Sequence, residues 1–138
     1  MVLFTGFQAL DVFGPLDALN ILAQSRPLEL SILASSTEPV STALAPGGFG
    51  QSVVPTHTFD AAPADLEVLL VPGGRGIRDA AVVQPAVGFL RDRFPRLRYL
   101  LTVCTGSALA AEAGVLDGRR ATSNKLHLRR VRDSWGWG

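Results

Sequence analysis

The only cysteine of the chain, Cys104, lies in a stretch whose residue types suit a nucleophilic turn. The apolar and β-branched residues 99–103 predict a strand buried on both faces, and the alanine-rich residues 107–113 predict a helix. Cys104 would then sit at the carboxyl end of a parallel strand and next to a helix amino terminus, whose partial positive charge favours thiolate over thiol. The other interpretation of a lone cysteine is a small buried hydrophobic residue.

Glycines follow a second apolar run, at residues 66–71, in the sequence Pro72-Gly73-Gly74-Arg75-Gly76. Consecutive glycines after a buried strand let backbone N–H groups approach a ligand without a side chain in the way, but they also suit a simple tight turn. The glycines of residues 46–50 match a phosphate loop only weakly, because no strand leads directly into them and no helix follows. His57, close to that turn, is interpreted as a surface or edge histidine.

The composition indicates one globular domain. The 138 residues are 47% hydrophobic and 18% charged, which suffices for a single core. No apolar run approaches the roughly 20 residues that span a bilayer, and no signal-peptide pattern opens the chain, so we expect a cytoplasmic protein without a membrane partner. No Cys/His cluster has zinc-ligand spacing, and we expect neither a metal nor a cofactor.

Basic residues concentrate in the second half of the chain. Residues 66–138 carry twelve basic and six acidic side chains, whereas residues 1–65 carry one basic and six acidic ones. Because most of these arginines flank predicted helices or lie near the end of the chain, we interpret them as solvated faces. We expect no nucleic-acid partner, since no helix-turn-helix pattern supports one.

Strands and helices alternate along the chain. The expected elements are a strand at 2–4, a helix from Pro15 to about 24, a strand at 28–34, a small hairpin within 35–65, a strand at 66–71, a helix at 84–93 with Pro85 in its first turn, the strand and helix around Cys104, a turn at 114–118, a strand at 119–122 and a helix at 125–132. A strand, a helix and a strand within about 30 residues indicate a right-handed crossover, and hence an α/β fold with a parallel sheet.

Four motifs, taken in order, resemble the DJ-1/PfpI superfamily. They are Leu10-Asp11-Val12-Phe13-Gly14-Pro15, Val71-Pro72-Gly73-Gly74, Val103-Cys104-Thr105-Gly106-Ser107 and Gly118-Arg119-Arg120-Ala121-Thr122. Among the branches of this superfamily, the pattern is most similar to that of the isonitrile hydratases, and it covers residue 2 to about residue 125. The resemblance implies a flavodoxin-like three-layer sandwich with a mainly parallel sheet, usually dimeric, and an active cysteine at a strained strand–helix turn.

Site residues follow from this resemblance. It implies that Cys104 is the nucleophile, that Asp11 is its acidic partner, and that the Thr105 hydroxyl orients the acid or the substrate. The backbone amides of Gly74 and Thr105 would stabilise an anion, and the glycines implied in binding are Gly73, Gly74 and Gly106. These segments can converge, because loops at the carboxyl ends of parallel strands open at one edge of the sheet. The other interpretation of Asp11 is a cap of the helix near Pro15.

The reaction implied by the resemblance is hydration of a small-molecule isocyanide to an N-substituted formamide. Attack by Cys104 would give a thioimidate that water converts, while Asp11 moves protons. A partly desolvated carboxyl near a thiolate should have a raised pKa, which suits alternate acid and base roles. Two other functions stay open: a glyoxalase-like or amidase-like enzyme, which is less favoured because no histidine adjoins the cysteine, and a non-catalytic sensor or ligand-binding domain.

The last residues depart from the resemblance, because relatives continue for several tens of residues that complete the sheet. We therefore expect residues 1–125 to form a partial DJ-1/PfpI-like domain and residues 126–138 to form an atypical basic tail. The sheet would be incomplete at its C-terminal end, with an exposed apolar face, poor packing from residue 124 onward and reduced stability. If the chain folds, we expect a homodimer.

Overall fold

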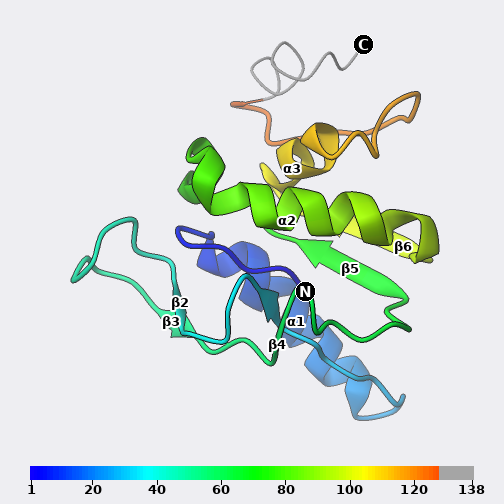
Figure 1. The fold of residues 1–138 in the computed structure, drawn as a ribbon. Helices are drawn as coiled ribbons and strands as arrows, with labels where there is room; N and C mark the ends of the chain where they lie inside the picture. The colour runs from blue at the N-terminus through cyan, green and yellow to red at the C-terminus, as the bar shows by residue number, and fades with distance from the viewer. Residues whose placement is uncertain (128–138) are drawn as a thin grey trace.

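The computed structural model describes residues 1–127 as an α/β arrangement (Figure 1). In chain order the elements are α1 (Ala9–Ala23), β1 (Leu33–Ala34), β2 (Val40–Ser41), β3 (Ser52–Val53), β4 (His57–Thr58), β5 (Val68–Val71), the 3-10 helix η1 (Arg75–Arg78), α2 (Ala80–Arg93), the 3-10 helix η2 (Phe94–Arg96), β6 (Tyr99–Thr102) and α3 (Gly106–Glu112). The parallel strands alternating with helices confirm the predicted fold class.

The parallel sheet has the first residues of the chain at its centre. β1 pairs with β4 and β5 pairs with β6, both in parallel register. Residues 1–3 join the two pairs, because the Leu3 N–H donates to the Leu33 carbonyl at 2.8 Å and the Val2 N–H donates to the Leu70 carbonyl at 2.9 Å. The order across the sheet is therefore β4, β1, residues 1–3, β5 and β6. β2 and β3 form a separate antiparallel pair, as the predicted hairpin requires.

Helices cover the two faces of this sheet unequally. Figure 1 shows α2 and α3 on one side of the sheet and α1 on the other. The buried residues of the α2 and α3 layer include Val83, Ala86, Val87, Phe89, Leu90, Leu109 and Ala110. In α1 only Val12 is buried, although large apolar side chains point outward along the helix, namely Leu10, Phe13, Leu19, Ile21 and Leu22. A helix with apolar residues on all sides is expected to be covered on more than one face.

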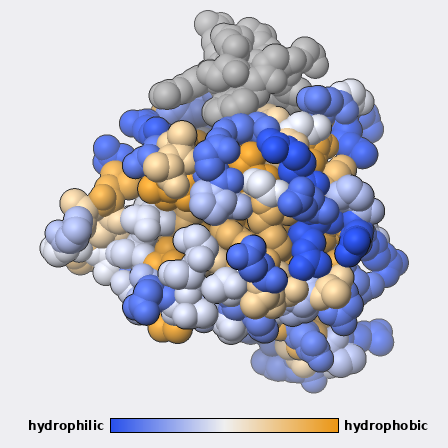
Figure 2. Space-filling model, viewed as in Figure 1, coloured by the Kyte–Doolittle hydropathy of each residue, from blue (hydrophilic) through white to orange (hydrophobic). Residues whose placement is uncertain are grey.

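One face of β5 and β6 is also open among the described residues. Tyr99 and Leu101 are two positions apart and so point to the same face, on which Val68 lies opposite Tyr99. Tyr99 is 54% exposed, and Val68 and Leu101 are exposed as well. The prediction that residues 99–103 form a strand buried on both faces is therefore wrong, whereas the expected exposed apolar face is present. On the α2 side, Figure 2 shows a mixed surface, with hydrophilic side chains gathered mainly at the right of the view and hydrophobic ones between them and at the left.

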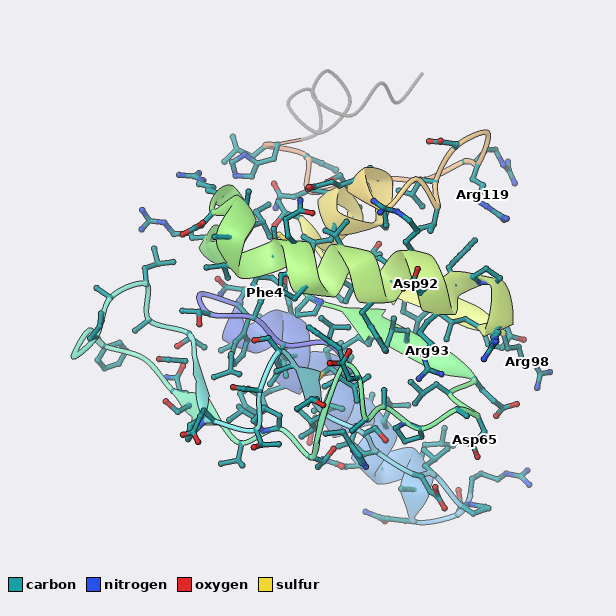
Figure 3. All side chains as sticks on the ribbon, viewed as in Figure 1. Phe4, Asp65, Asp92, Arg93, Arg98 and Arg119 are labelled. Carbon is teal, nitrogen blue, oxygen red and sulfur yellow. The ribbon has the colours of Figure 1, made fainter. Side chains whose placement is uncertain are left out.

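Arginines of the second half pack against aromatic rings at the surface. The Arg93 guanidinium lies 5.6 Å from the centre of the Phe89 ring and donates to the Ala62 carbonyl at 2.9 Å. The Arg119 guanidinium lies 5.1 Å from the centre of the Phe94 ring. Figure 3 shows Arg93 below α2 and Arg119 above it. These contacts belong to the scaffold and agree with the interpretation of the basic residues as solvated faces.

Both long helices begin earlier than predicted, so their prolines lie inside the helices rather than in the first turns. We placed Pro15 and Pro85 in first turns, but the structure has each within its helix. An interior proline costs one backbone hydrogen bond, which tertiary packing can offset. α2 starts ahead of the predicted range 84–93, after Asp79, whose side chain accepts the Ala81 N–H at 3.0 Å. This N-cap indicates the start of α2 in the sequence, but Pro85 favoured a later start in the prediction.

Several predicted strands are short or absent. Residues 2–4 pair through an isolated bridge at Val2, and only Leu33–Ala34 of the predicted strand 28–34 is β1. Residues 119–122 form no strand, because β propensity produces a strand only where a neighbour is available for pairing. Residues 125–127 form a turn, and the rest of the predicted helix 125–132 and of the tail 126–138 lies outside the described residues.

Candidate active site

Cys104 occupies a strained turn between β6 and α3. Its φ is 55°, which makes it the only non-glycine residue with positive φ in the part of the chain that the structure describes. Such a backbone costs energy for a side chain with a Cβ and is typical of functional turns that expose a nucleophile. Gly106 makes the turn possible, because a Cβ at this position would collide with the Val71 carbonyl at the end of β5.

Asp11 reaches the turn from the first helical turn of α1. The N-cap of α1 is Gln8 and its side chain makes no capping hydrogen bond, so the interpretation of Asp11 as the cap is wrong. Asp11 Oδ2 instead accepts the Gly73 N–H at 3.1 Å, and the carboxyl lies within hydrogen-bonding reach of the Cys104 side chain. Burial raises the pKa of Asp11, and the hydrogen bonds from Gly73 and Cys104 oppose this rise only in part.

Gly73 and Gly74 pack directly against Thr105. A Cβ on Gly73 would lie 2.5 Å from Thr105 Oγ1 and 3.1 Å from Asp11 Oδ2, so only glycine fits between these groups. The Gly74 N–H donates to Thr105 Oγ1 at 3.2 Å. Because this amide already has an acceptor, an anion could use it only if the hydroxyl moved aside. The pocket formed by the Gly74 and Thr105 amides therefore stays a prediction.

Three polar residues missed by the sequence analysis lie beside the Cys104 sulfur or the Cys104 carbonyl. Asn124 Nδ2 donates to Cys104 Sγ at 3.3 Å. Ser107 Oγ donates to Ser123 Oγ at 2.8 Å and lies 3.3 Å from the Cys104 carbonyl. The available signal was the polar pair Ser123-Asn124 directly after the Gly118–Thr122 motif, which we interpreted as a strand running into a tail.

A cavity of about 570 Å³ opens onto this site. Its lining residues are Gln8, Gly74, Arg75, Ile77, Arg78, Ala80, Val83, Cys104, Thr105, Glu112, Asn124, Leu126 and His127. The volume suits a small molecule, and the mixture of apolar and polar side chains suits recognition of one. His57 is not among them; its Nδ1 lies 2.8 Å from Thr56 Oγ1. Over residues 1–127, no group of His, Cys, Asp or Glu is arranged to hold a metal ion.

The structure therefore brings together the residues that the resemblance implied. Asp11 comes from α1, Gly73 and Gly74 from the loop after β5, and Cys104 and Thr105 from the turn after β6. These loops meet at the carboxyl edge of the parallel sheet, as predicted. Both the Asp11 carboxyl and the Asn124 amide contact the thiol.

This geometry defines an α/β protein with a thiol at a strand–helix turn and an acidic group beside it. The family model described as the DJ-1/PfpI family matches residues 1–135, and the chain belongs to the DJ-1/PfpI family. Within the described residues, no helix has the length and apolar character needed to cross a membrane.

Individual relatives differ in what their names state. The chain is 33% identical over 123 residues to an isonitrile hydratase of Pseudomonas putida, a match that covers 89% of this chain and 50% of that protein. It is 36% identical over 78 residues to the deglycase PfpI of Pyrococcus furiosus, covering 56% of this chain and 47% of the relative. A ThiJ/PfpI family protein of Pseudomonas syringae has a similar structure, with a TM-score of 0.76, 34% identity and coverage of 89% and 48%. The chain thus spans about half the length of these relatives.

Proposed function

We propose that the chain carries the cysteine site of an isonitrile hydratase, which adds water to an isocyanide to give an N-substituted formamide. The observation that carries this proposal is that the Asp11 carboxyl, held by the Gly73 N–H, lies beside the Cys104 thiol, and that Cys104 lines a cavity of small-molecule size. A nucleophile and a proton carrier within reach of one another are what this reaction needs.

In the first half of the reaction, Cys104 Sγ forms a bond to the terminal carbon of the isocyanide. The carbon gains negative charge in this step, and the protonated Asp11 carboxyl donates a proton to it, which gives a thioimidate bound to the enzyme. The raised pKa of Asp11 favours the protonated form that this step requires.

In the second half, the Asp11 carboxylate accepts a proton from water as the water oxygen attacks the thioimidate carbon, and Asp11 then passes this proton to the substrate nitrogen. The tetrahedral adduct then expels Cys104 Sγ and returns its hydroxyl proton to Asp11, which releases the formamide. The net change is addition of one water to one isocyanide. Thr105 accepts a hydrogen bond from the Gly74 N–H, which leaves its own O–H to donate to the substrate.

Similarity supports the hydratase over the other activities. The match to the hydratase covers 89% of the chain, and the match to the deglycase covers 56%. His57 has no place in the cavity with Cys104, although His127 lines it. A cysteine nucleophile suits more than one reaction, so the candidate activities are distinguished by substrate rather than by the site alone.

The experiment that tests the proposal follows conversion of an alkyl isocyanide such as n-butyl isocyanide to its formamide by NMR. We expect the wild-type protein to turn the isocyanide over and Cys104→Ser to lose at least about 10³-fold in rate, because a serine hydroxyl is a much weaker nucleophile at neutral pH. A Cys104→Ser variant as fast as wild type would contradict the proposal. Turnover of methylglyoxal without turnover of the isocyanide would indicate a glyoxalase-like enzyme, and binding without turnover of either would indicate a sensor or ligand-binding domain.

A further inference from the structure

Asn124 contacts the reacting sulfur of Cys104 and has no role in the reaction described above. Its Nδ2 donates to Cys104 Sγ at 3.3 Å, within the usual range for a hydrogen bond to sulfur. The residue comes from a segment far from both α1 and the glycine loop, so it approaches the thiol independently of Asp11. A donor aimed at sulfur interacts more strongly with a thiolate than with a thiol.

The backbone fixes which end of the Asn124 amide faces the sulfur. Asn124 Oδ1 accepts the Leu126 N–H at 3.0 Å, and the Asn124 carbonyl accepts the His127 N–H at 3.0 Å. A flipped amide would place two donors against each other at Leu126 and leave the sulfur facing an oxygen. The turn at residues 125–127 therefore presents an N–H group, rather than a carbonyl, to Cys104.

A second set of contacts ties this segment to the Cys104 turn. Ser107 Oγ and Ser123 Oγ are 2.8 Å apart, and both lie near the Cys104 carbonyl, at 3.3 Å and 3.5 Å. Ser107 is buried in α3, so the pair anchors the residue before Asn124 to the core. The Asn124 donor is thus held from two directions, by the serine pair and by its own turn.

We propose that Asn124 is a catalytic residue that stabilises the Cys104 thiolate through its Nδ2–H group, with Ser107 and Ser123 as positioning residues. The inference rests on the proposed function for its catalytic meaning. In the reaction, the donor would favour the attacking thiolate and would stabilise it again when the tetrahedral adduct expels it. Asp11 then moves protons, whereas Asn124 controls the charge on sulfur.

The test measures thiol reactivity directly, by the rate of iodoacetamide alkylation from about pH 5 to pH 9. This range includes the ordinary pKa values of histidine and cysteine side chains. Asn124→Asp keeps an oxygen for the Leu126 N–H but replaces the donor with a negative charge. We expect alkylation at neutral pH to slow by about 10- to 100-fold, the value of a hydrogen bond to a charged group, and the pH profile to move upward. Asn20→Asp, the same exchange at an exposed position of α1, is the matched control and should leave the rate unchanged.

Other charged groups around the thiol must be held constant in this comparison. The titratable or charged residues that face the same cavity or the thiol are Asp11, Arg75, Arg78, Glu112 and His127. Asn124→Leu, which removes the donor without adding charge, separates the hydrogen bond from electrostatic repulsion and should also slow alkylation. Asn124→Gln retains an N–H group and should recover part of the wild-type rate.

Alkylation of Asn124→Leu at the wild-type rate across the pH range would overturn the inference. So would a loss of rate that tracks the loss of melting temperature equally in Asn124→Leu and Asn124→Gln, because that pattern marks a purely structural turn. Ser123→Ala should slow alkylation less than Asn124→Leu, since it loosens the donor without removing it. Because iodoacetamide alkylation needs no isocyanide turnover, stabilisation of the Cys104 thiolate by Asn124 can be shown even if the proposed function fails, and isocyanide turnover can be shown even if Asn124 has no effect.

Discussion

The two groups proposed to react come from layers that are packed very differently. Cys104 leads directly into α3, in which every residue from Gly106 to Ala111 is buried. Asp11 belongs to α1, in which only Val12 is buried. The Cys104 turn is therefore anchored by the core, whereas the Asp11 carboxyl is held by its contacts with Gly73 and Cys104 and by a thinly packed helix. The proposed reaction at this edge of the sheet therefore depends as much on the thinly packed α1 layer, here called the weaker layer, as on the well-packed layer of α2 and α3, here called the stronger layer.

The largest expected effect is on activity, and it tests the weaker layer. Asp11→Asn preserves size and can still accept the Gly73 N–H, but it cannot carry protons. We expect turnover to fall by about 10²- to 10⁴-fold with little change in melting temperature, and Asp11→Glu to be less harmful. Asp17→Asn, the same exchange at an exposed position of the same helix, should be neutral. Parallel losses of activity and melting temperature in Asp11→Asn would identify a structural role instead.

The second prediction compares the packing of the two layers directly. Leu90 is buried in α2, whereas Ile21 in α1 is 64% exposed. Leu90→Ala should lower the free energy of unfolding by about 2–5 kcal/mol, while Ile21→Ala should change it by about 0.5 kcal/mol or less. Denaturant unfolding at two protein concentrations provides the measurement. A cost for Ile21→Ala that grows with protein concentration would mean that a second copy covers the outer face of α1 and would support the homodimer expected from the resemblance.

A third prediction concerns two glycines in the stronger layer. A Cβ on Gly106 would collide with the Val71 carbonyl, whereas a Cβ on Gly88 in α2 would meet no atom within 4 Å. Gly106→Ala should therefore destabilise the protein by about 1–3 kcal/mol, and Gly88→Ala should stabilise it by roughly 0.5–1 kcal/mol. Thermal melts of the two variants decide the matter. If both alanines are tolerated equally, the turn at Cys104 is less constrained than its close contacts imply.

The smallest expected effect is the pH dependence that Asp11 gives to stability. Its pKa is raised above the ordinary value of 3.8 in the folded state, so the folded protein holds this proton more tightly than the unfolded chain. The resulting stabilisation is complete below pH 3.8 and is lost as the pH rises through the folded-state pKa. Above that pH, Asp11→Asn should unfold at the same or a higher temperature than wild type, with Asp17→Asn as the control. A stability gain of wild type over Asp11→Asn on raising the pH would contradict the sign.

The candidate site residues that follow strands could be predicted from the sequence. Those that reach the site only through tertiary packing, from a segment that follows no strand, were missed. Cys104 and Gly73 each follow an apolar run, and loops after parallel strands meet at one edge, so their convergence could be inferred. Asn124 follows no strand and is held beside the thiol by the contact of Ser107 with Ser123 and by the turn at residues 125–127. No local pattern encodes a contact of that kind.

The predicted helix boundaries were wrong for a different reason, because the preference of proline for the first turn competed with other local signals for the helix start. Pro15 and Pro85 predicted helix starts, but both lie inside helices whose remaining residues outweigh the cost of one missing hydrogen bond. At α2 the decisive residue was Asp79, a cap that lies before the proline. The misplaced start of α1 also explains why Asp11 could be mistaken for a cap.

The central position of residues 1–3 in the sheet has a consequence for how the chain folds during synthesis. These residues hydrogen-bond to Leu33 on one side and to Leu70 on the other, so their pairing is complete only when residue 70 has also been synthesised. Contacts between such distant positions slow folding, because the entropy of closing a long loop is lost before the stabilising hydrogen bonds form. Until then the apolar residues 1–4 can pair with other segments, and a pause in translation before β5 would lengthen that exposure.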